Sequence, residues 1–381
     1  MPLRSVHSDV LIIGSGPAGL ASAIAAARHG LHVEVVDARK PPLDKACGEG
    51  LLPGTLESLA AIGFDLRSGL DPAESVSLHG VRFIGNSCSD HFTTIQCAFP
   101  GTLGRGIRRT ALHQLLFDRA TSLGVRFHWE NTLRSISPGK NIAVHTDNQT
   151  LHARYLIGAD GHHSPVAAFA GLDPGTTHSR RIGLRQHYAV TPWSRFVEIY
   201  WSNHGQAYVT PISPGEVCIA FVTREKAVSP DQALRHFPAL QRHLVAAQPS
   251  GTPRGSITLG RTLRSVTSGN IALIGDASGS VDAITGEGIA LSFRQAAALA
   301  LAVKTGNLAA YQQAHRRIMR LPGIMSRSLL LMDRSPLLRD SVLGLFRRSP
   351  GLFDGLLRIH IGHSPLPLSG TKSLLEADYT S

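Results

Sequence analysis

Cysteine is scarce in this 381-residue chain, and it is not arranged in pairs. The four cysteines, Cys47, Cys88, Cys97 and Cys218, stand far apart with no Cys-x-x-Cys among them. This spacing is typical of reduced thiols in a cytoplasmic protein, rather than of a disulfide framework or a zinc ribbon.

Histidine pairs raise the question of a metal site, but their sequence neighbours do not complete one. Neither His162-His163 nor His360-x-x-His363 has a carboxylate or a cysteine at ligand spacing. We therefore expect no bound metal.

Aromatic residues make up only 6% of the chain, and the 38 Lys and Arg residues are scattered along it. The formal net charge of +11 would suit nucleic acid, anionic lipid or phosphate-bearing ligands, and by itself it selects none of them. Because no stacking platform or recognition-helix pattern accompanies the charge, we expect no nucleic-acid partner.

Long uninterrupted hydrophobic runs are also lacking. The uncharged stretch 10–27 approaches membrane-spanning length, but three glycines and Pro17 divide it into strand, turn and helix. The stretch resembles a signal peptide, yet Asp9 interrupts its approach and cleavage would remove the best ligand-binding motif of the chain. We expect a cytoplasmic protein without a transmembrane span.

The segment DVLIIGSGPAGLASAIAAARHGLHVEVVDARK, which starts at Asp9, has the pattern of strand, glycine turn, helix and second strand. Gly14 permits the tight turn, Gly16 lets a pyrophosphate approach the backbone, and Gly19 lets helix and strand pack closely. The helix N-terminus presents unpaired N–H groups to the anion. Asp37 follows Gly14 by 23 residues, close to the spacing of about 20 expected for an acid that binds a ribose. These features predict a dinucleotide site.

NADP is one candidate for this turn, with Arg39 and Lys40 on its additional phosphate. Asp37 argues against NADP, because its carboxylate would repel a 2′-phosphate.

A second glycine-rich turn, GDASGSVDAITGEGIALSFRQA, occupies residues 275–296. The preceding apolar run delivers Asp276 to a strand end, and Gly286-Glu287-Gly288 opens a helix expected to begin at Ile289. A carboxylate suits sugar-like hydroxyls, and glycine N–H groups at a helix N-terminus suit a developing negative charge. We expect this turn to hold the other half of the dinucleotide.

These motifs resemble those of FAD-dependent oxidoreductases of the para-hydroxybenzoate hydroxylase fold, especially the geranylgeranyl reductase branch and related flavin hydroxylases. The likeness covers about residues 8–310 and includes the two glycine turns and GADGHHSPV at 158–166. It implies an α/β (α+β) fold, with a Rossmann-like FAD-binding domain, an inserted antiparallel β-sheet substrate domain and C-terminal helices.

The resemblance implies FAD as the cofactor and assigns contacts to it. Asp276 would meet the ribityl chain, and Asp160 would support both the cofactor and nicotinamide approach, with NADPH or NADH as the electron donor. Arg109 matches a family arginine that contacts FAD. The other implied contacts are Pro17, Ala18, Gly286, Gly288 and Ile289.

The segment KACGEGL at 45–51 resembles a loop that lies beside the isoalloxazine in geranylgeranyl reductases. Gly48 and Gly50 would let the backbone approach a flat ring, and Cys47 is the candidate catalytic residue of the loop. A buried, inert thiol is the alternative. Glu49 stands where the family usually has glycine.

Other departures from the family leave the reaction open. Ala167 replaces the arginine that normally ends the Asp-Gly motif, and Gly279 and Ala283 replace the His and Pro usual in aromatic hydroxylases. The segment AYVTPISP retains little of the reductase pattern Tyr-x-Trp-x-Phe-Pro. Its Tyr208 is a candidate catalytic residue of the substrate pocket, and a tyrosine packed on its sheet is the alternative.

Alternating residues at 75–85, 91–99 and 182–223 predict a second layer of antiparallel strands. Its inner face would roof the flavin and create an apolar substrate pocket. The expected domains are an FAD-binding domain (1–74, 100–180 and 268–320), a β-sheet substrate domain (75–99 and 181–267) and a C-terminal helical segment (321–381).

The C-terminal region repeats a helix-start pattern, with Ser335 and Ser349 as caps and a proline after each. Apolar stripes stand beside arginines in these helices. We therefore expect them to line a lipophilic entrance and to contact an anionic membrane surface. Helices packed on the protein's own core are the alternative.

The sequence thus predicts an FAD-dependent oxidoreductase that acts on a lipophilic small molecule. The preferred reaction is hydroxylation of an aromatic or polyketide-like substrate by a flavin monooxygenase with NAD(P)H and O2. Hydride transfer to a polyprenyl double bond is one alternative, and a non-redox flavin-dependent cyclase or isomerase is another. A nucleotide-binding module without catalysis is a third.

Overall fold

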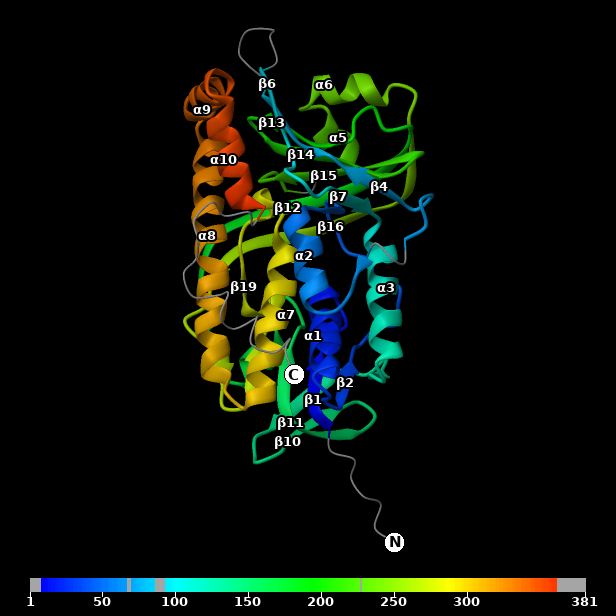
Figure 1. The fold of residues 1–381 in the computed structure, drawn as a ribbon, viewed down its shortest axis with the longest axis vertical. Coiled ribbons are helices and arrows are strands. Elements are labelled where there is room, and N and C mark those ends of the chain that lie inside the picture. The colour runs from blue at the N-terminus through cyan, green and yellow to red at the C-terminus, as the bar shows by residue number, and fades with distance from the viewer. Residues whose placement is uncertain (1–7, 67–69, 86–92, 227, 362–381) are drawn as a thin grey trace.

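The computed structural model describes residues 8–66, 70–85, 93–226 and 228–361. Within these ranges the chain forms three β-sheets, with helices packed against them and along one edge of the molecule (Figure 1). This mixed architecture confirms the predicted α/β fold class. Cys88 and His363 lie outside the described residues.

The first sheet surrounds the first glycine turn. Its order is β17-β18-β11-β1-β2-β8, and β10 joins β11 and β9 in antiparallel pairs. The strands are β1 (Ser8–Ile13), β2 (Val33–Val36), β8 (Arg126–His128), β9 (Leu133–Ser137), β10 (Ile142–Thr146), β11 (Thr150–Gly158), β17 (Thr267–Ser268) and β18 (Ile271–Leu273). β1, β2, β11 and β18 are parallel and rich in buried Val, Ile and Leu, as expected for strands covered on both faces.

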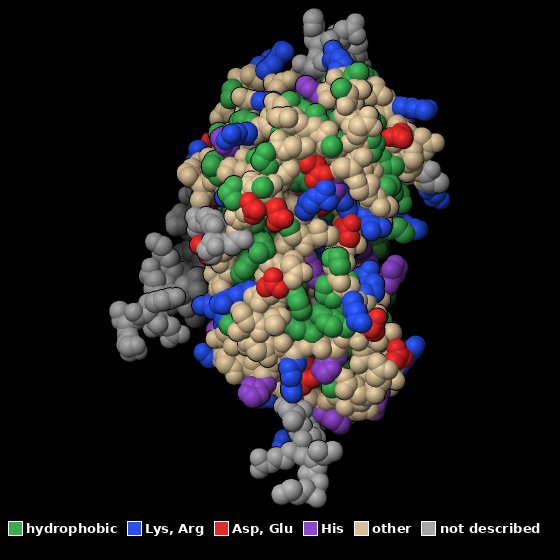
Figure 2. Space-filling model, turned by 90° about the vertical axis from the view of Figure 1, so that its right-hand side faces the viewer, with side chains coloured by type: hydrophobic (Ala, Val, Ile, Leu, Met, Phe, Trp, Pro, Cys, Tyr) green, Lys and Arg blue, Asp and Glu red, His purple; other side chains and the backbone are tan. Residues whose placement is uncertain are grey.

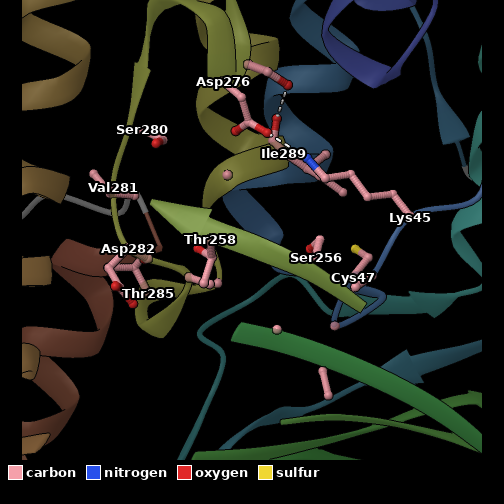
Figure 3. A pocket seen from close by; sticks show the side chains of 18 of the residues that line it. Lys45, Cys47, Ser256, Thr258, Asp276, Ser280, Val281, Asp282, Thr285 and Ile289 are labelled. Atoms are coloured by element: carbon pink, nitrogen blue, oxygen red, sulfur yellow. Dashed lines mark hydrogen bonds and ion pairs between the residues drawn. The ribbon is translucent and has the colours of Figure 1, made fainter. Parts of the chain in front are cut away.

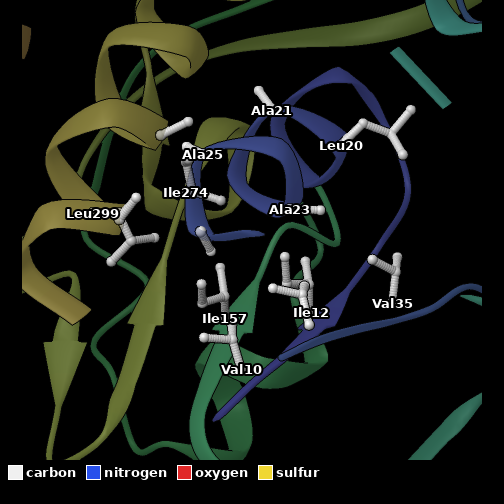
Figure 4. Close-up of a cluster of buried hydrophobic side chains, with 14 of the residues drawn as sticks. Val10, Ile12, Leu20, Ala21, Ala23, Ala25, Val35, Ile157, Ile274 and Leu299 are labelled. Atoms are coloured by element: carbon white, nitrogen blue, oxygen red, sulfur yellow. The ribbon is translucent and has the colours of Figure 1, made fainter. Parts of the chain in front are cut away.

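Helix α1 (Pro17–Arg28) packs on this sheet through small side chains. Ala21, Ala23 and Ala25 lie on different sides of the helix, and all three are buried in the same hydrophobic cluster as the strand residues (Figure 4). A Cβ added at Gly19 would lie 1.9 Å from the carbonyl oxygen of Gly14, so only glycine allows helix and turn to approach this closely. The helix ends before Gly30, whose φ of +77° favours glycine.

The second sheet has the order β19-β16-β12-β15-β14-β13-β5-β6. Its strands are β5 (Gly80–Gly85), β6 (Thr93–Ala98), β12 (Thr176–Ala189), β13 (Phe196–Ser202), β14 (Gly205–Ser213), β15 (Glu216–Thr223), β16 (Gln248–Thr262) and β19 (Gly279–Ser280). A small third sheet contains β3 (Gly50–Leu51), β7 (Gly104–Ile107) and β4 (Ser75–Leu78).

The expectation of one antiparallel layer is wrong in two places. The segment 75–85 divides at His79, so that β4 pairs with β7 in the third sheet and only β5 enters the second. Strand β5 also pairs with β13 in parallel. Alternation predicts which side chains face the core, but it carries no information on the direction of a partner brought in from a distant part of the chain.

The remaining helices lie around the sheets. They are α2 (Pro53–Ala61), α3 (Arg109–Ser122), α4 (Pro165–Phe169), α5 (Pro230–Leu234), α6 (Pro238–Gln241), α7 (Gly288–Thr305), α8 (Leu308–Arg334), α9 (Pro336–Arg348) and α10 (Pro350–His360), with 3-10 turns η2 (Arg242–Leu244), η3 (Gly275–Ser278) and η4 (Ala283–Thr285). Helices α8, α9 and α10 stand together along one edge of the molecule (Figure 1).

The C-terminal helices begin where the sequence predicts, although only one cap forms as expected. The Ser335 hydroxyl accepts a bond from the Leu338 N–H at 3.3 Å. The prediction for Ser349 is wrong, because its side chain makes no capping bond to α10. Buried residues of α8, α9 and α10, such as Met332, Phe346 and Phe353, join a core cluster with the second sheet.

Two surface properties follow from the described residues. None of the helices within them combines the length and the apolarity needed to cross a bilayer. Basic and acidic side chains are intermixed on the face shown in Figure 2, so the net positive charge is not gathered into one patch there.

Candidate active site

A cavity of about 1250 Å³ is lined by residues of both large sheets and of the C-terminal helices. It brings together most of the residues predicted from the sequence. Those lining it are Gly14, Gly16, Pro17, Ala18, Asp37, Cys47, Gly48, Gly50, Arg109, Asp160, Tyr208, Asp276, Gly286, Gly288 and Ile289. Gly19 does not line the cavity, since it is used in the packing of α1.

The N-terminus of α1 opens into this cavity. Gly16 is the N-cap, the first turn contains no acid, and no side-chain bond caps the helix within the described chain. A Cβ added at Gly16 would meet no described atom within 4 Å. Unpaired N–H groups therefore face open space at the positive end of the helix dipole, which suits a phosphate group.

Asp37 lies at the edge of the cavity next to this turn. Its carboxylate accepts bonds from the N–H and the hydroxyl of Ser15, both at 2.8 Å, and from the Arg39 N–H at 2.9 Å. The buried His113 supports the same turn through Nε2, 2.9 Å from the Ser15 carbonyl oxygen. Lys40, considered above for a 2′-phosphate, pairs with Glu130 instead.

Asp276 sits in η3 between two cationic groups. Its Oδ2 is 2.9 Å from Lys45 Nζ and 3.4 Å from His162 Nε2. Figure 3 shows Lys45 directed at Asp276, with Cys47 on the same loop as Lys45. Burial opposes ionisation of Asp276, but Lys45 and His162 outweigh it and lower the pKa of the carboxyl group. Asp276 is therefore charged at neutral pH and accepts hydrogen bonds.

Several buried polar atoms on the cavity wall have no hydrogen-bond partner within the described chain. They include Arg109 Nε, Asp160 Oδ1 and His162 Nδ1. The other oxygen of Asp160 accepts a bond from the Val166 N–H at 3.0 Å, and burial raises the pKa of this carboxyl group. Because unsatisfied buried polar groups are costly, such atoms around one cavity indicate a polar ligand.

The Cys47 loop is held by Glu49, which adopts a φ of +57° where the related loop has glycine. Its carboxylate accepts a bond from the Arg109 N–H at 3.0 Å and lies 2.6 Å from His187 Nε2. These bonds fix a left-handed backbone conformation that a non-glycine residue seldom adopts. Burial raises the pKa of Cys47, so its thiol keeps its proton at neutral pH.

Behind the loop lies a charged network that the sequence analysis did not find. The Arg185 guanidinium bonds the Asp44 carboxylate at 2.7 Å and donates to His187 Nδ1 at 3.0 Å. The same Arg185 nitrogen also lies 3.2 Å from His187 Nε2, the ring nitrogen that faces Glu49. Cys218 lies close to this pair, with its Sγ within 4.8 Å of the ligand atoms of Glu49 and His187. The one sequence signal was the unusual glutamate in a glycine-rich loop.

Tyr208 lies in the cavity wall on β14, and its hydroxyl donates to the Ile284 carbonyl oxygen at 2.7 Å. Burial raises its pKa, so the phenol stays protonated. The side chain thus packs on its sheet, holds the backbone before Gly286 and also faces the cavity. Its catalytic role remains a prediction.

One part of the cavity wall, here called the apolar end, consists of residues that pack together in a single hydrophobic cluster. They are Val81, Phe83, Val197, Ile199, Leu329, Met332, Val342, Phe346, Phe353, Leu356 and Leu357. The polar end contains the two glycine turns. The cavity therefore joins a site for a charged ligand to space for a lipophilic one.

Residues 7–306 match the family described as "FAD binding domain". The chain belongs to this family. With named reductases and monooxygenases among its relatives, the protein is an FAD-dependent oxidoreductase, and the resemblance inferred from the motifs is confirmed.

Among its relatives, a menaquinone reductase of Mycolicibacterium smegmatis is 28% identical over 81% of this chain and 80% of that protein. A digeranylgeranylglycerophospholipid reductase of Methanothermobacter thermautotrophicus is 26% identical over 76% and 75%. The ubiquinone hydroxylase UbiL of Rhodospirillum rubrum is 28% identical over 77% and 71%. The flavin-dependent brominase Bmp2 has the same fold, with a TM-score of 0.74, 20% identity and 94% of each chain covered.

The cavity of the flavoenzyme fits FAD on independent grounds. Gly16, Gly48, Gly286 and Gly288 all line it, and a Cβ added at any of them would meet no described atom within 4 Å. The backbone at these four positions is therefore open to a ligand with phosphates at one end and a flat ring at the other. The unpartnered polar atoms described above lie on the same wall.

The Gly-Asp turn of the flavoenzyme is supported from behind by His315 of α8. The Ser278 hydroxyl donates to the Gly275 carbonyl oxygen at 2.8 Å, and His315 Nε2 lies 3.0 Å from the same hydroxyl. With its proton on Nε2, a neutral His315 donates to Ser278. Burial, with a contribution from Arg316, lowers the pKa of His315 from 6.5 to about 4.

This shift predicts a loss of stability in mild acid. A lowered pKa means that the folded state binds fewer protons than the unfolded chain, so stability falls as the pH falls from about 6.5 towards 4. We expect a loss of up to about 3 kcal/mol from this group across the window. Urea unfolding at several pH values gives the profile of the free energy of unfolding against pH, which measures this loss. His315→Gln should flatten that part of the profile, whereas His178→Gln, at an exposed histidine, should keep it. Identical profiles for His315→Gln and the unchanged protein would contradict the assignment.

A buried ionic cluster connects α8 to the second sheet and to the turn before Gly286. Arg181 pairs with Asp282 and lies 3.5 Å from Asp333, and all three are buried. The Asp282 carboxylate also accepts bonds from the Ser179 hydroxyl at 2.7 Å and the Ile284 N–H at 3.0 Å. The sequence analysis missed this cluster, because its members are about 50 to 150 residues apart and none has a motif.

Proposed function

We propose that the flavoenzyme reduces a carbon–carbon double bond in the prenyl chain of a lipid such as a menaquinone. The observation that carries this proposal is the apolar end of the cavity. Its aliphatic and aromatic side chains come from β5, β13 and all three C-terminal helices. A prenyl chain is apolar throughout, so it matches this wall without leaving a buried polar group unpaired. The two reductases among the relatives support the same choice.

Some residues of the chain would bind the cofactor, and others would supply a proton to the substrate. Bound FAD would supply a hydride, and NADPH or NADH would be its source. Asp276 and the N-termini of α1 and α7 would hold the cofactor. Addition of hydride across a double bond also requires a proton. Cys47 and Tyr208 both line the cavity and keep their protons, because burial raises their pKa values.

Hydroxylation, the reaction preferred from the sequence, is the second candidate. Its support is the ubiquinone hydroxylase relative, which is 28% identical to this chain and matches 77% of it. A quinone ring would then be the reacting part of the substrate, and O2 would be consumed.

One assay separates the two reactions. FAD-loaded protein is mixed with menaquinone in detergent and with NADPH or NADH, once without oxygen and once in air, and the product is weighed by mass spectrometry. We expect two added hydrogen atoms without oxygen. One added oxygen atom, formed only in air, would favour hydroxylation instead. An unchanged lipid after reduction of the flavin would contradict both for this substrate class.

Substitution tests the proposed proton donors. Cys47→Ala or Tyr208→Phe should lower turnover by about 10² to 10⁴ if that side chain supplies the proton. Flavin absorbance serves as the control for cofactor binding. If both variants turn over at the original rate with FAD bound, neither side chain is the donor.

A further inference from the structure

Exposed apolar side chains are concentrated on the C-terminal helices. Within the described residues, seven large apolar side chains that face solvent lie between positions 321 and 352, and only five lie elsewhere. The seven are Leu321, Ile324, Leu331, Leu337, Leu338, Leu345 and Leu352. Leu337 is 83% exposed and Leu331 is 57% exposed. We call this surface the α8–α9 face. Scattered exposed leucines need no explanation, but a concentration on adjacent helices indicates a contact surface.

The charged residues of the same region are predominantly basic. Residues 308–361 contain nine arginines against three aspartates, with no lysine and no glutamate. Arg320, Ile324, Arg327, Leu331 and Arg334 are all exposed and recur every three or four residues, so they share one stripe of α8. Two of the arginines of α9, Arg347 and Arg348, are exposed, and Arg348 follows the exposed Leu345 by three residues on the same side of the helix. Apolar and cationic side chains thus alternate on one face.

The cavity reaches the surface at this face. Leu331 and Leu338 both line the cavity, and they are 57% and 41% exposed. The cavity that contains the apolar end therefore extends to these two exposed leucines.

We propose that the α8–α9 face docks on an anionic lipid bilayer and that a lipophilic substrate enters the cavity between Leu331 and Leu338. The leucines would enter the acyl boundary while the arginines pair with lipid phosphates. A second copy of this chain fits the α8–α9 face less well than a bilayer, because the arginines of the two copies would repel one another. The inference goes beyond the proposed reduction, since it holds for any substrate that resides in the bilayer.

Vesicle flotation tests the docking. Full-length, FAD-loaded protein is mixed with vesicles of phosphatidylcholine alone or with added phosphatidylglycerol. We expect flotation with the anionic vesicles and partial release by high salt. The double variant Leu337→Glu/Leu345→Glu, at two exposed positions away from the cavity wall, should weaken partitioning at least about tenfold. Val245→Glu is the matched control. Val245 is an 87% exposed apolar residue directly after η2, and its substitution should not change partitioning onto the vesicles.

Three other outcomes would decide against the docking. Absence of flotation, or equal loss in the double variant and the control, would overturn it. So would a dimer in light scattering that the double variant dissociates while vesicle binding is unchanged. Turnover of a short-chain substrate in solution separates this idea from the proposed reaction. If the double variant keeps that turnover and loses turnover of vesicle-embedded substrate, the docking is supported, whereas a lack of turnover in both proteins concerns the reaction alone.

Discussion

Replacement of Gly16 by valine is expected to abolish FAD binding while the protein stays folded. An added side chain at this N-cap would meet no described atom of the protein, so it would project into the part of the cavity that the helix N–H groups face. That is where a pyrophosphate would lie. We expect the affinity for FAD to fall more than about a hundredfold, or about 2.7 kcal/mol. Flavin absorbance of the purified protein and calorimetric titration of the apoprotein measure the loss.

Two further variants show that the effect belongs to the ligand and not to the fold. Gly351→Val, in the first turn of α10, also adds a side chain where no described atom lies within 4 Å, and it should leave FAD binding unchanged. Gly19→Ala should instead destabilise the protein, because its Cβ would lie 1.9 Å from the Gly14 carbonyl oxygen. If Gly16→Val retained normal flavin content, the glycine turn would not be the phosphate site.

Replacement of Arg181 by methionine is expected to reduce the free energy of unfolding by about 3–5 kcal/mol. The change would leave Asp282 without its charged partner in a site where both side chains are almost fully inaccessible to solvent. Asp333 would keep its hydrogen bond from Gln206 and its ion pair with Arg224, which is half exposed. Urea unfolding monitored by circular dichroism measures the difference.

An exposed ion pair provides the comparison. Lys40 and Glu130 lie 2.7 Å apart, but their side chains are 60% and 64% exposed, so Lys40→Met should cost at most about 1 kcal/mol. Flavin content adds a second readout, because loss of Arg181 should also loosen the turn that Asp282 holds through the Ile284 N–H. Equal stabilities for the two variants would show that the buried cluster does not tie α8 to the sheet.

The fold alone does not select the reaction. A brominase with 20% identity shares nearly the whole architecture, and curated relatives at 26–28% identity include both reductases and a hydroxylase. Chemistry in this family is therefore a property of the cavity wall and of what reaches it. In this chain the wall is closed by α8, α9 and α10, which extend beyond the matched residues 7–306.

Local patterns determined the cofactor end of the site. The turn at Gly14, Gly16 and Gly19, and the turn around Asp276, could be interpreted from neighbouring residues, because a strand, a tight turn and a helix N-terminus are all set by short-range sterics and hydrogen bonding. The same reasoning predicted α1 and the starts of α9 and α10. The motifs formed by these residues also carry the resemblance to FAD-dependent oxidoreductases.

Only the tertiary structure decided how His187 stands between Glu49 and Arg185, how Arg181 joins Asp282 to Asp333, and where the cavity opens among the leucines of α8 and α9. Partners in these contacts stand up to about 150 residues apart, and each residue by itself has the pattern of an ordinary strand or helix position. Long-range pairing depends on how whole sheets and helices pack, and a one-dimensional pattern carries no information on that packing.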